Sequence, residues 1–338
     1  MVSIRRLILP FLALLILLTC LATADGLPNI RMSLPPVMGS LPLAFAQGWG
    51  LFEKHNLRVE LVGLSDNQER SAALMAGDID GMVCDVTTAI LLVSGGTDVV
   101  ITSAVYQENQ TDSLIIISPR SFNINSLEEL LSTENSADKI ATIYRSDLEY
   151  EIDLLLQTLG YRINKEDRYT YWTDMLALTL WFGSQLVPAA AFPEPYITYI
   201  SNYPYAGGQL ELVRLSDFEG IDLLPSVVVF RREVIEESPE LIEDFYAAYQ
   251  ETIKMINTSS REKLVETGID EALSLFFPGL TAEAVPEGIL DSFEIPYFQP
   301  PRMLCKEQFE GVLAWAISKR YARLYLAYEE LTTDQFLQ

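Results

Sequence analysis

Short stretches typical of β-strands alternate with stretches typical of helices over much of the chain, and this order constrains the fold most. Apolar runs of strand length occur at residues 29–34, 57–62, 79–84 and 99–106. Apolar residues at helical spacing lie between them at 43–52, 68–76 and 86–93. Strands that alternate with connecting helices predict a mostly parallel sheet covered by helices.

The same scheme repeats further along the chain. Strands are predicted at 113–118, 139–144, 169–172 and 188–192, and helices at 127–131, 147–159 and 175–182. A pattern of helix, glycine, short turn and apolar strand at 72–83 is echoed at 178–192. A chain of 338 residues is also too long for one compact core. The sequence therefore predicts two similar α/β lobes.

The C-terminal third is almost entirely helical and cannot continue a sheet. After an apolar strand at 225–230, helices are predicted at 238–256, 262–276, 281–290 and 306–328. We expect this tail to pack back on the first lobe, with the chain crossing between lobes near 107–113 and 220–226. The predicted fold class is α/β, with two Rossmann-like lobes joined by two crossovers and a helical C-terminal tail. The first lobe would comprise 28–110 and 224–338, and the second 111–223.

Residues 1–24 have the features of a signal peptide. Arg5 and Arg6 form a basic start, an apolar stretch too short to span a membrane follows, and the small residues 22–24 suit cleavage. Alternatively, residues 17–20 resemble a bacterial lipobox, with Thr19 in place of the usual Gly, Ala or Ser before the cysteine, and Cys20 would then be lipidated. Both alternatives export the protein, to the periplasm or to the outer face of the cytoplasmic membrane.

The charge and the scarcity of metal-binding residues exclude several functions. A formal net charge of −24 opposes binding to nucleic acids and to anionic lipids. The chain has one histidine and three cysteines, and their spacing fits no metal site. No catalytic or cofactor motif occurs, so neither an enzyme nor a cofactor is expected. Cys84 and Cys305 would form either a disulfide or two separate thiols.

Several segments resemble the sulfonate/nitrate/thiamine-pyrimidine family of solute-binding proteins, which have the type II periplasmic binding protein fold. The segments that carry the resemblance are 35–42, 46–60, Ala73-Leu74-Met75-Ala76-Gly77-Asp78-Ile79-Asp80-Gly81, Phe192-Pro193-Glu194-Pro195-Tyr196 and 231–240. The resemblance implies the receptor of an ABC importer, which captures a small molecule between its lobes and docks on a membrane permease. We expect a monomer. A synthase branch of the same family is an alternative, but it needs histidines and a cysteine cluster that this chain lacks.

Ligands of open parallel sheets bind beyond the carboxyl ends of the strands, and this rule selects the candidate site residues. They are Met38, Gly39, Ser40, Asp85, Thr87, Tyr106, Arg145, Ser146, Trp172, Asp174, Glu194 and Tyr196. The same loops also contain Pro35, Val86, Gln107, Asp147, Thr173 and Pro193. Ser40, Thr87 and Ser146 could instead cap helices. Tyr106 and Trp172 could either fill the core or enclose a ring of the ligand.

The charges in these loops bear on the ligand. Acidic residues predominate, and Arg145 is the single basic residue among the candidates. A sulfonate or a nitrate would require several donors or cations. We therefore expect a neutral or cationic ligand with an aromatic ring, such as a pyrimidine or a vitamin-like heterocycle. A sulfonate-, nitrate- or taurine-type anion is the alternative.

Overall fold

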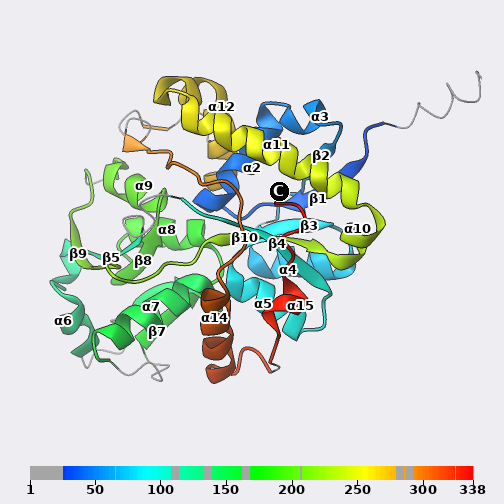
Figure 1. Cartoon of the computed structure of the whole chain (residues 1–338). Coiled ribbons are helices and arrows are strands. Elements are labelled where there is room, and N and C mark those ends of the chain that lie inside the picture. Colours follow the sequence, from blue (N-terminus) through cyan, green and yellow to red (C-terminus); the bar gives the residue numbers. More distant parts are fainter. Residues whose placement is uncertain are drawn as a thin grey trace, which may run out of the picture.

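A computed structural model describes residues 26–64, 66–107, 114–132, 139–161, 168–205, 208–278, 285–286, 289, 292–323 and 325–337. It contains two five-stranded sheets, each flanked by helices (Figure 1). The predicted signal peptide and the predicted lipidation of Cys20 lie outside the described residues. Within the described part of the chain, no helix is long and apolar enough to cross a membrane.

The first sheet combines strands from distant parts of the chain. Its order is β2 (Arg58–Leu61), β1 (Asn29–Ser33), β3 (Gly81–Cys84), β10 (Ser226–Arg231) and β4 (Val99–Val105). β1 is parallel to β2 and β3, whereas β10 is antiparallel to both β3 and β4. The sheet is therefore mixed, because β10 enters it from the second crossover and in the opposite direction.

The second sheet consists of consecutive strands of the middle segment. Its order is β7 (Tyr169–Trp172), β6 (Ile140–Ile143), β8 (Ala189–Pro193), β5 (Leu114–Pro119) and β9 (Leu212–Asp217). β6 is parallel to β7 and β8, and β5 is antiparallel to β8 and β9. Strand β9 was not predicted. It lies at the edge of the sheet and has no fully buried residue, so it lacks the apolar run of a central strand.

Helices cover both sheets. Those that follow strands of the first sheet are α2 (Leu41–Gly48), α3 (Leu51–Lys54), α4 (Asn67–Ala76), α5 (Val86–Ser94) and α10 (Arg232–Glu237). Those of the second sheet are α6 (Leu127–Ser132), α7 (Asp147–Thr158), α8 (Met175–Gly183) and α9 (Tyr196–Asn202). The helix predicted at 43–52 is divided into α2 and α3, because Gly50 adopts a left-handed conformation with φ +66°.

The C-terminal helices pack mainly on the first lobe. α11 (Pro239–Thr258) contacts α2 and α3, α12 (Arg261–Phe276) contacts α2, and α15 (Tyr328–Leu331) contacts β4. In contrast, α14 (Lys306–Ser318) contacts α5 of the first lobe and α7 of the second (Figure 1). The helix predicted at 306–328 ends early, and Arg320 just beyond it has a left-handed φ of 61°. The helix predicted at 281–290 lies mostly outside the described residues.

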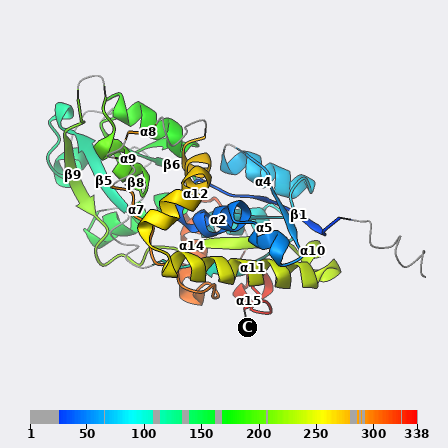
Figure 2. The same ribbon diagram turned by 90° about the horizontal axis from the view of Figure 1, so that it is seen from above.

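The chain passes between the two sheets after β4 and again after β9, and Figure 2 shows the resulting two lobes from above. The predicted fold class, with two lobes, two crossovers and a helical tail on the first lobe, is therefore confirmed. The exact lobe boundaries stay a prediction. The boundary at 110/111 falls outside the described residues, and that at 223/224 lies between β9 and β10. Cys84 is buried, Cys305 is exposed, and both are free thiols.

Candidate functional site

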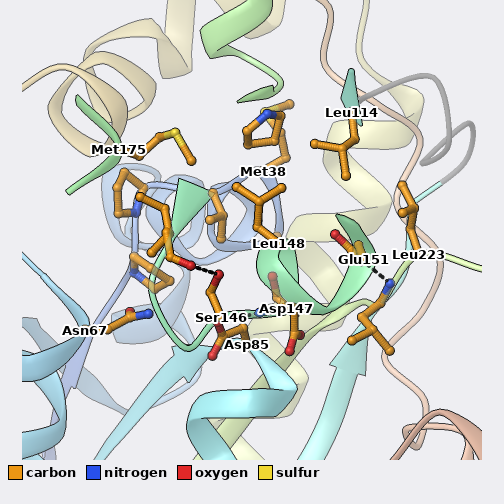
Figure 3. A pocket seen from close by; sticks show the side chains of 18 of the residues that line it. Met38, Asn67, Asp85, Leu114, Ser146, Asp147, Leu148, Glu151, Met175 and Leu223 are labelled. Carbon is orange, nitrogen blue, oxygen red and sulfur yellow. Dashed lines mark hydrogen bonds between the residues drawn. The ribbon is translucent and has the colours of Figure 1, made fainter. Parts of the chain in front are cut away.

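A cavity of about 210 Å³ lies where the two lobes meet. The first lobe contributes the loop after β1, two residues of α4 and the end of β3. The second lobe contributes the N-terminal ends of α7 and α8 and the loop after β8, and the second crossover contributes residues 223–226. Figure 3 shows side chains from both lobes directed into the same space. This is the arrangement expected for a ligand held between two lobes.

Most of the cavity wall is aliphatic. The apolar side chains that line it are Pro35, Pro36, Val37, Met38, Val105, Leu114, Ile143, Leu148, Met175, Pro193, Leu223, Leu224 and Pro225. Tyr196, which is fully buried, is the one aromatic residue among the described lining residues. Its hydroxyl donates to the carbonyl oxygen of Pro36 in the other lobe, at 3.2 Å.

Seven of the residues that were predicted from the ends of strands line the cavity. They are Met38, Gly39, Asp85, Ser146, Asp174, Glu194 and Tyr196. Pro35, Gln107, Asp147, Thr173 and Pro193, from the same loops, line it as well. The rule succeeds for these residues because the carboxyl ends of β1, β3, β6, β7 and β8 all face the junction of the lobes.

Five predicted residues lie outside the cavity wall: Ser40, Thr87, Tyr106, Arg145 and Trp172. Ser40 is fully buried, and its hydroxyl has no hydrogen-bond partner among the described residues. Thr87 is buried behind the wall and donates to Asp147.

The two aromatic candidates have structural neighbours of their own. The guanidinium of Arg302 lies 3.9 Å from the ring centroid of Tyr106, and the Tyr106 hydroxyl donates to Gln308. The ring of Trp172 packs 5.6 Å from that of Trp181. These rings therefore do not face one another across the cavity.

The cation of the cavity is Arg70 and not Arg145. Arg145 has a left-handed φ of 55° after β6, and its guanidinium lies 4.9 Å from the ring centroids of both Tyr144 and Tyr321. This conformation directs it away from the cavity. Arg70 lines the cavity from α4 and is only 4% exposed.

Hydrogen bonds position Arg70 within its own lobe. Its terminal nitrogens donate to the carbonyl oxygen of Leu64 at 3.1 Å and to Oδ1 of Asn67 at 2.6 Å. Its buried Nε has no partner among the described residues. Burial lowers the pKa of this guanidinium.

The N-termini of α5 and α7 meet at the floor of the cavity, and carboxylates connect them. Asp85 caps α5, since its Oδ1 accepts from the backbone N–H of Thr88 at 2.7 Å. Asp147 reaches across from the other lobe and accepts from the N–H groups of Val86 and Thr87, both at 2.8 Å. The Thr87 hydroxyl donates to the same carboxylate at 2.6 Å. In return, the N–H of Asp147 donates to Asp85 at 3.2 Å.

Ser146 caps α7, as the sequence suggested. Its hydroxyl accepts from the N–H of Glu149 at 3.3 Å. The same hydroxyl donates to the carbonyl oxygen of Ile143 at 2.7 Å, and Figure 3 shows this bond as a dashed line from Ser146. With its own helix capped by Ser146, the carboxylate of Asp147 is free to bind α5. The two lobes are therefore joined by direct hydrogen bonds at the cavity floor.

Burial raises the pKa of several carboxyl groups in the cavity. Burial and the nearby Asp85 raise the pKa of Asp147 to about 8, and burial also raises the pKa of Asp85. Burial, with Asp147 as the next cause, raises the pKa of Glu151 well above its usual value. Burial raises the pKa of Glu194. Two neighbouring buried carboxyl groups such as Asp85 and Asp147 tend to retain a proton, because ionisation of both would place two negative charges close together.

Backbone N–H groups hold the remaining carboxylates in place. Glu151 accepts from the N–H of Leu224 in the second crossover at 2.8 Å (Figure 3). Asp174 caps α8 by accepting from Ala177 at 2.6 Å, and Glu194 accepts from Thr198 at 3.1 Å.

Cavity residues that do not follow a strand were not predicted from the sequence. They are Asn67, Arg70, Leu114, Leu148, Glu151 and residues 223–226. One signal was available for Arg70: it lies four residues before the apolar Leu74 on α4, so the two share one helix face, and both are buried.

Comparisons with known proteins find curated proteins of low sequence identity and solved structures of similar fold. No family model matches the chain. A protein of Brucella abortus that is provisionally named a binding protein is 25% identical over 259 residues, which cover 76% of each chain. A Brucella melitensis protein of the same provisional name matches equally.

Solved structures of binding proteins superimpose on nearly the whole chain. The alkanesulfonate-binding protein of Xanthomonas axonopodis pv. citri has a TM-score of 0.68 at 14% identity, covering 92% of this chain and 99% of its own. The nitrate-binding protein of Synechocystis PCC 6803 has a TM-score of 0.66 at 14% identity, with 92% and 88% covered. The aliphatic sulphonate binding protein of Escherichia coli has a TM-score of 0.63 at 18% identity, with 90% and 97% covered.

These neighbours are sulfonate- and nitrate-binding proteins, the kind of protein that the sequence segments resemble, and their similarity in fold extends over nearly the whole chain. Together with the strand orders and the cavity at the lobe junction, they establish that this chain has the type II periplasmic binding protein fold.

Proposed function

We propose that the chain is the exported receptor of an ABC importer and that it binds a small neutral or cationic solute in the cavity between its lobes. The fold supports the first part, since the solved structures of similar fold include binding proteins for sulfonates and for nitrate. The chemistry of the cavity supports the second part.

The observation that carries the ligand class is the balance of charge in the cavity. Five carboxyl groups line it, from Asp85, Asp147, Glu151, Asp174 and Glu194. They face one guanidinium, that of Arg70, among the described lining residues. An oxyanion placed here would lose its water shell beside carboxyl groups that repel it whenever they are ionised, which is unfavourable. A neutral solute that donates hydrogen bonds, or a cation, is favoured.

A pyrimidine or a vitamin-like heterocycle remains the candidate ligand. The aliphatic wall suits the faces of a flat ring, and the carboxyl groups suit ring nitrogens and amino substituents. Among the described residues, aromatic stacking would come from Tyr196, because Tyr106 and Trp172 lie outside the wall. The competing ligand class is a sulfonate, nitrate or taurine-type anion, for which the single Arg70 would be the anchor.

Capture by lobe closure is the proposed mechanism. A solute that contacts both α4 and α7 would stabilise the closed arrangement relative to an open one. The closed form, as a monomer, would then dock on a membrane permease. We assign the chain no catalytic role, and its sole histidine, His55, lies outside the cavity wall and bonds to Glu251 of α11 at 2.8 Å.

Calorimetry with the mature protein tests the ligand class. Pyrimidines, flavins and other vitamins are titrated alongside alkanesulfonates, nitrate and taurine. A cationic ligand lowers the raised pKa values of the cavity carboxyls, so binding at neutral pH should release protons. The apparent binding enthalpy should then differ between buffers of different ionisation enthalpy.

An Arg70→Gln variant separates the two ligand classes. A neutral or cationic ligand should bind this variant about as well as it binds the wild type. Tight binding of an alkanesulfonate to the wild type that Arg70→Gln abolishes, with no binding of pyrimidines or flavins, contradicts the proposal.

A further inference from the structure

The N-terminus of α5 offers a complete set of donors for an oxyanion. Three consecutive backbone N–H groups, from Val86, Thr87 and Thr88, point out of this nine-residue helix, and the Thr87 hydroxyl lies beside them. Such a helix end favours a negatively charged group, because its unpaired N–H groups carry partial positive charge. In this chain, however, every one of these donors is already occupied.

The occupying groups are carboxylates of the protein itself. Asp85 takes the N–H of Thr88, as an ordinary cap does. Asp147 accepts from the other three donors, and it comes from the opposite lobe, 61 positions after Val86 and 60 after Thr87 in the chain. Its two oxygens are each within 2.8 Å of a backbone nitrogen, as the oxygens of a bound carboxylate or nitrate would be.

Asp147 is buried and lines the cavity, so it stands where a solute could reach the helix end. Any anion that entered would have to displace it, and displacement would leave a buried carboxyl group without its three donors. Occupation of the donors excludes an anion whether the carboxyl group is ionised or protonated.

We propose that Asp147 is a specificity-determining residue, which fills the oxyanion position at the N-terminus of α5 and thereby excludes anionic solutes from the cavity. This inference rests on the proposed function, because it assumes that the cavity is the solute site. It assigns the preference for neutral or cationic solutes to one side chain.

Removing the carboxylate should convert the helix end into an anion site. In Asp147→Ala, the N–H groups of Val86 and Thr87 and the Thr87 hydroxyl lose their acceptor, and a small oxyanion such as formate or nitrate fits the vacated volume. We expect each of these anions to raise the Tm of Asp147→Ala by about 5 °C relative to chloride at equal ionic strength, when present at about 100 times its Kd. Wild-type protein should respond to formate and nitrate as it does to chloride.

Two matched variants control this test. Asp147→Asn keeps the shape of the side chain and leaves no room for an anion, so it should show no specific response. Asp66→Ala removes another aspartate cap, which accepts from Gln68 and Glu69 of α4 but does not line the cavity, and it should show no response either. Asp147→Ser, a smaller change at a helix start, replaces Asp147→Ala if the alanine variant does not fold.

The inference is overturned if the folded Asp147→Ala or Asp147→Ser protein gains no affinity for formate or nitrate, or if the wild type binds them equally well. Its failure can be distinguished from that of the proposed function. If vitamins and pyrimidines bind the wild type and the folded variant gains no anion affinity, the inference alone fails. If none of them binds but the variant gains affinity, the inference stands and the proposed ligand class fails.

Discussion

Gly81 of β3 pairs directly with Phe230 of the antiparallel strand β10, and the two strands approach closely there. A Cβ atom added at Gly81 would lie 2.5 Å from a ring carbon of Phe230 and 2.7 Å from the carbonyl oxygen of Val229. Because backbone cannot yield as a surface side chain does, we expect Gly81→Ala to lower the free energy of unfolding by about 1–3 kcal/mol in urea denaturation.

Gly63 provides the matched comparison for this substitution. A Cβ atom at Gly63 would meet no atom within 4 Å, so Gly63→Ala should leave the urea midpoint essentially unchanged. Equal midpoints for Gly81→Ala and the wild type would show that the pairing of β3 with β10 is looser than the structure indicates.

Some residues of the site can be predicted from the sequence, and others cannot. A rule about strand ends locates Asp85, Ser146 and Glu194, because the position of a strand end follows from local apolar patterning. It cannot locate Arg70, whose place in the cavity depends on how a helix is rotated against its sheet. It also cannot give the direction of a side chain, and Arg145 therefore lies in a predicted loop yet faces Tyr321.

At the scale of elements, α14 is attached to the second lobe by a buried ionic network. Lys319, just after α14, lies 3.1 Å from an oxygen of Glu149 and 2.8 Å from one of Asp153 on α7. These carboxylate side chains are 0% and 2% exposed. The indole of Trp315 donates to Asp153 at 2.8 Å, and the hydroxyl of Tyr321 donates to Glu149 at 3.0 Å.

Removing the cation should therefore leave two buried carboxylates without a counter-charge. We expect Lys319→Met to destabilise the protein by about 3 kcal/mol, near the low end for a broken buried pair because the ammonium retains some contact with solvent. Lys306→Met at the exposed start of α14 is the control, and it should change the thermal midpoint little. Similar losses in the two variants would contradict a special role for Lys319.

Helices and strands with a strong apolar periodicity were predictable from the sequence, but the residues at which they begin and end were not. The apolar run of β10 and the amphipathic face of α11 follow from local sequence. Strand β9 escaped prediction because partners in the sheet define an edge strand more than its own residues do. The break at Gly50 escaped because its left-handed conformation depends on contacts beyond the helix pattern.

At the scale of the whole molecule, closure should depend on pH. The carboxyl of Asp147 is removed from water only where the lobes meet, and there burial raises its pKa from the usual 3.8 to about 8. The closed form thus binds more protons, so it is favoured at low pH and loses this advantage as pH rises through about 8. Asp85 and Glu151, whose pKa values are also raised by burial, act in the same direction, whereas the charge of Arg70 opposes the shift of Asp85.

X-ray scattering of the unliganded protein measures this dependence. We expect its radius of gyration to increase between about pH 6 and about pH 9. Asp147→Asn, which cannot titrate, should show a smaller increase over the same range. An unchanged radius in the wild type, or a decrease, would argue against opening of the lobes by ionisation at the cavity floor.

The insertion of β10 between β3 and β4 determines the order in which the lobes can be completed. Every strand of the second sheet has been synthesised once residue 217 is added, and these strands are consecutive in the chain. The first sheet lacks an inner strand until residue 231. The first lobe, although it begins the chain, is thus the last to have its sheet completed. Until β10 is inserted, β3 and β4 have unpaired edges with which strands of other chains could pair.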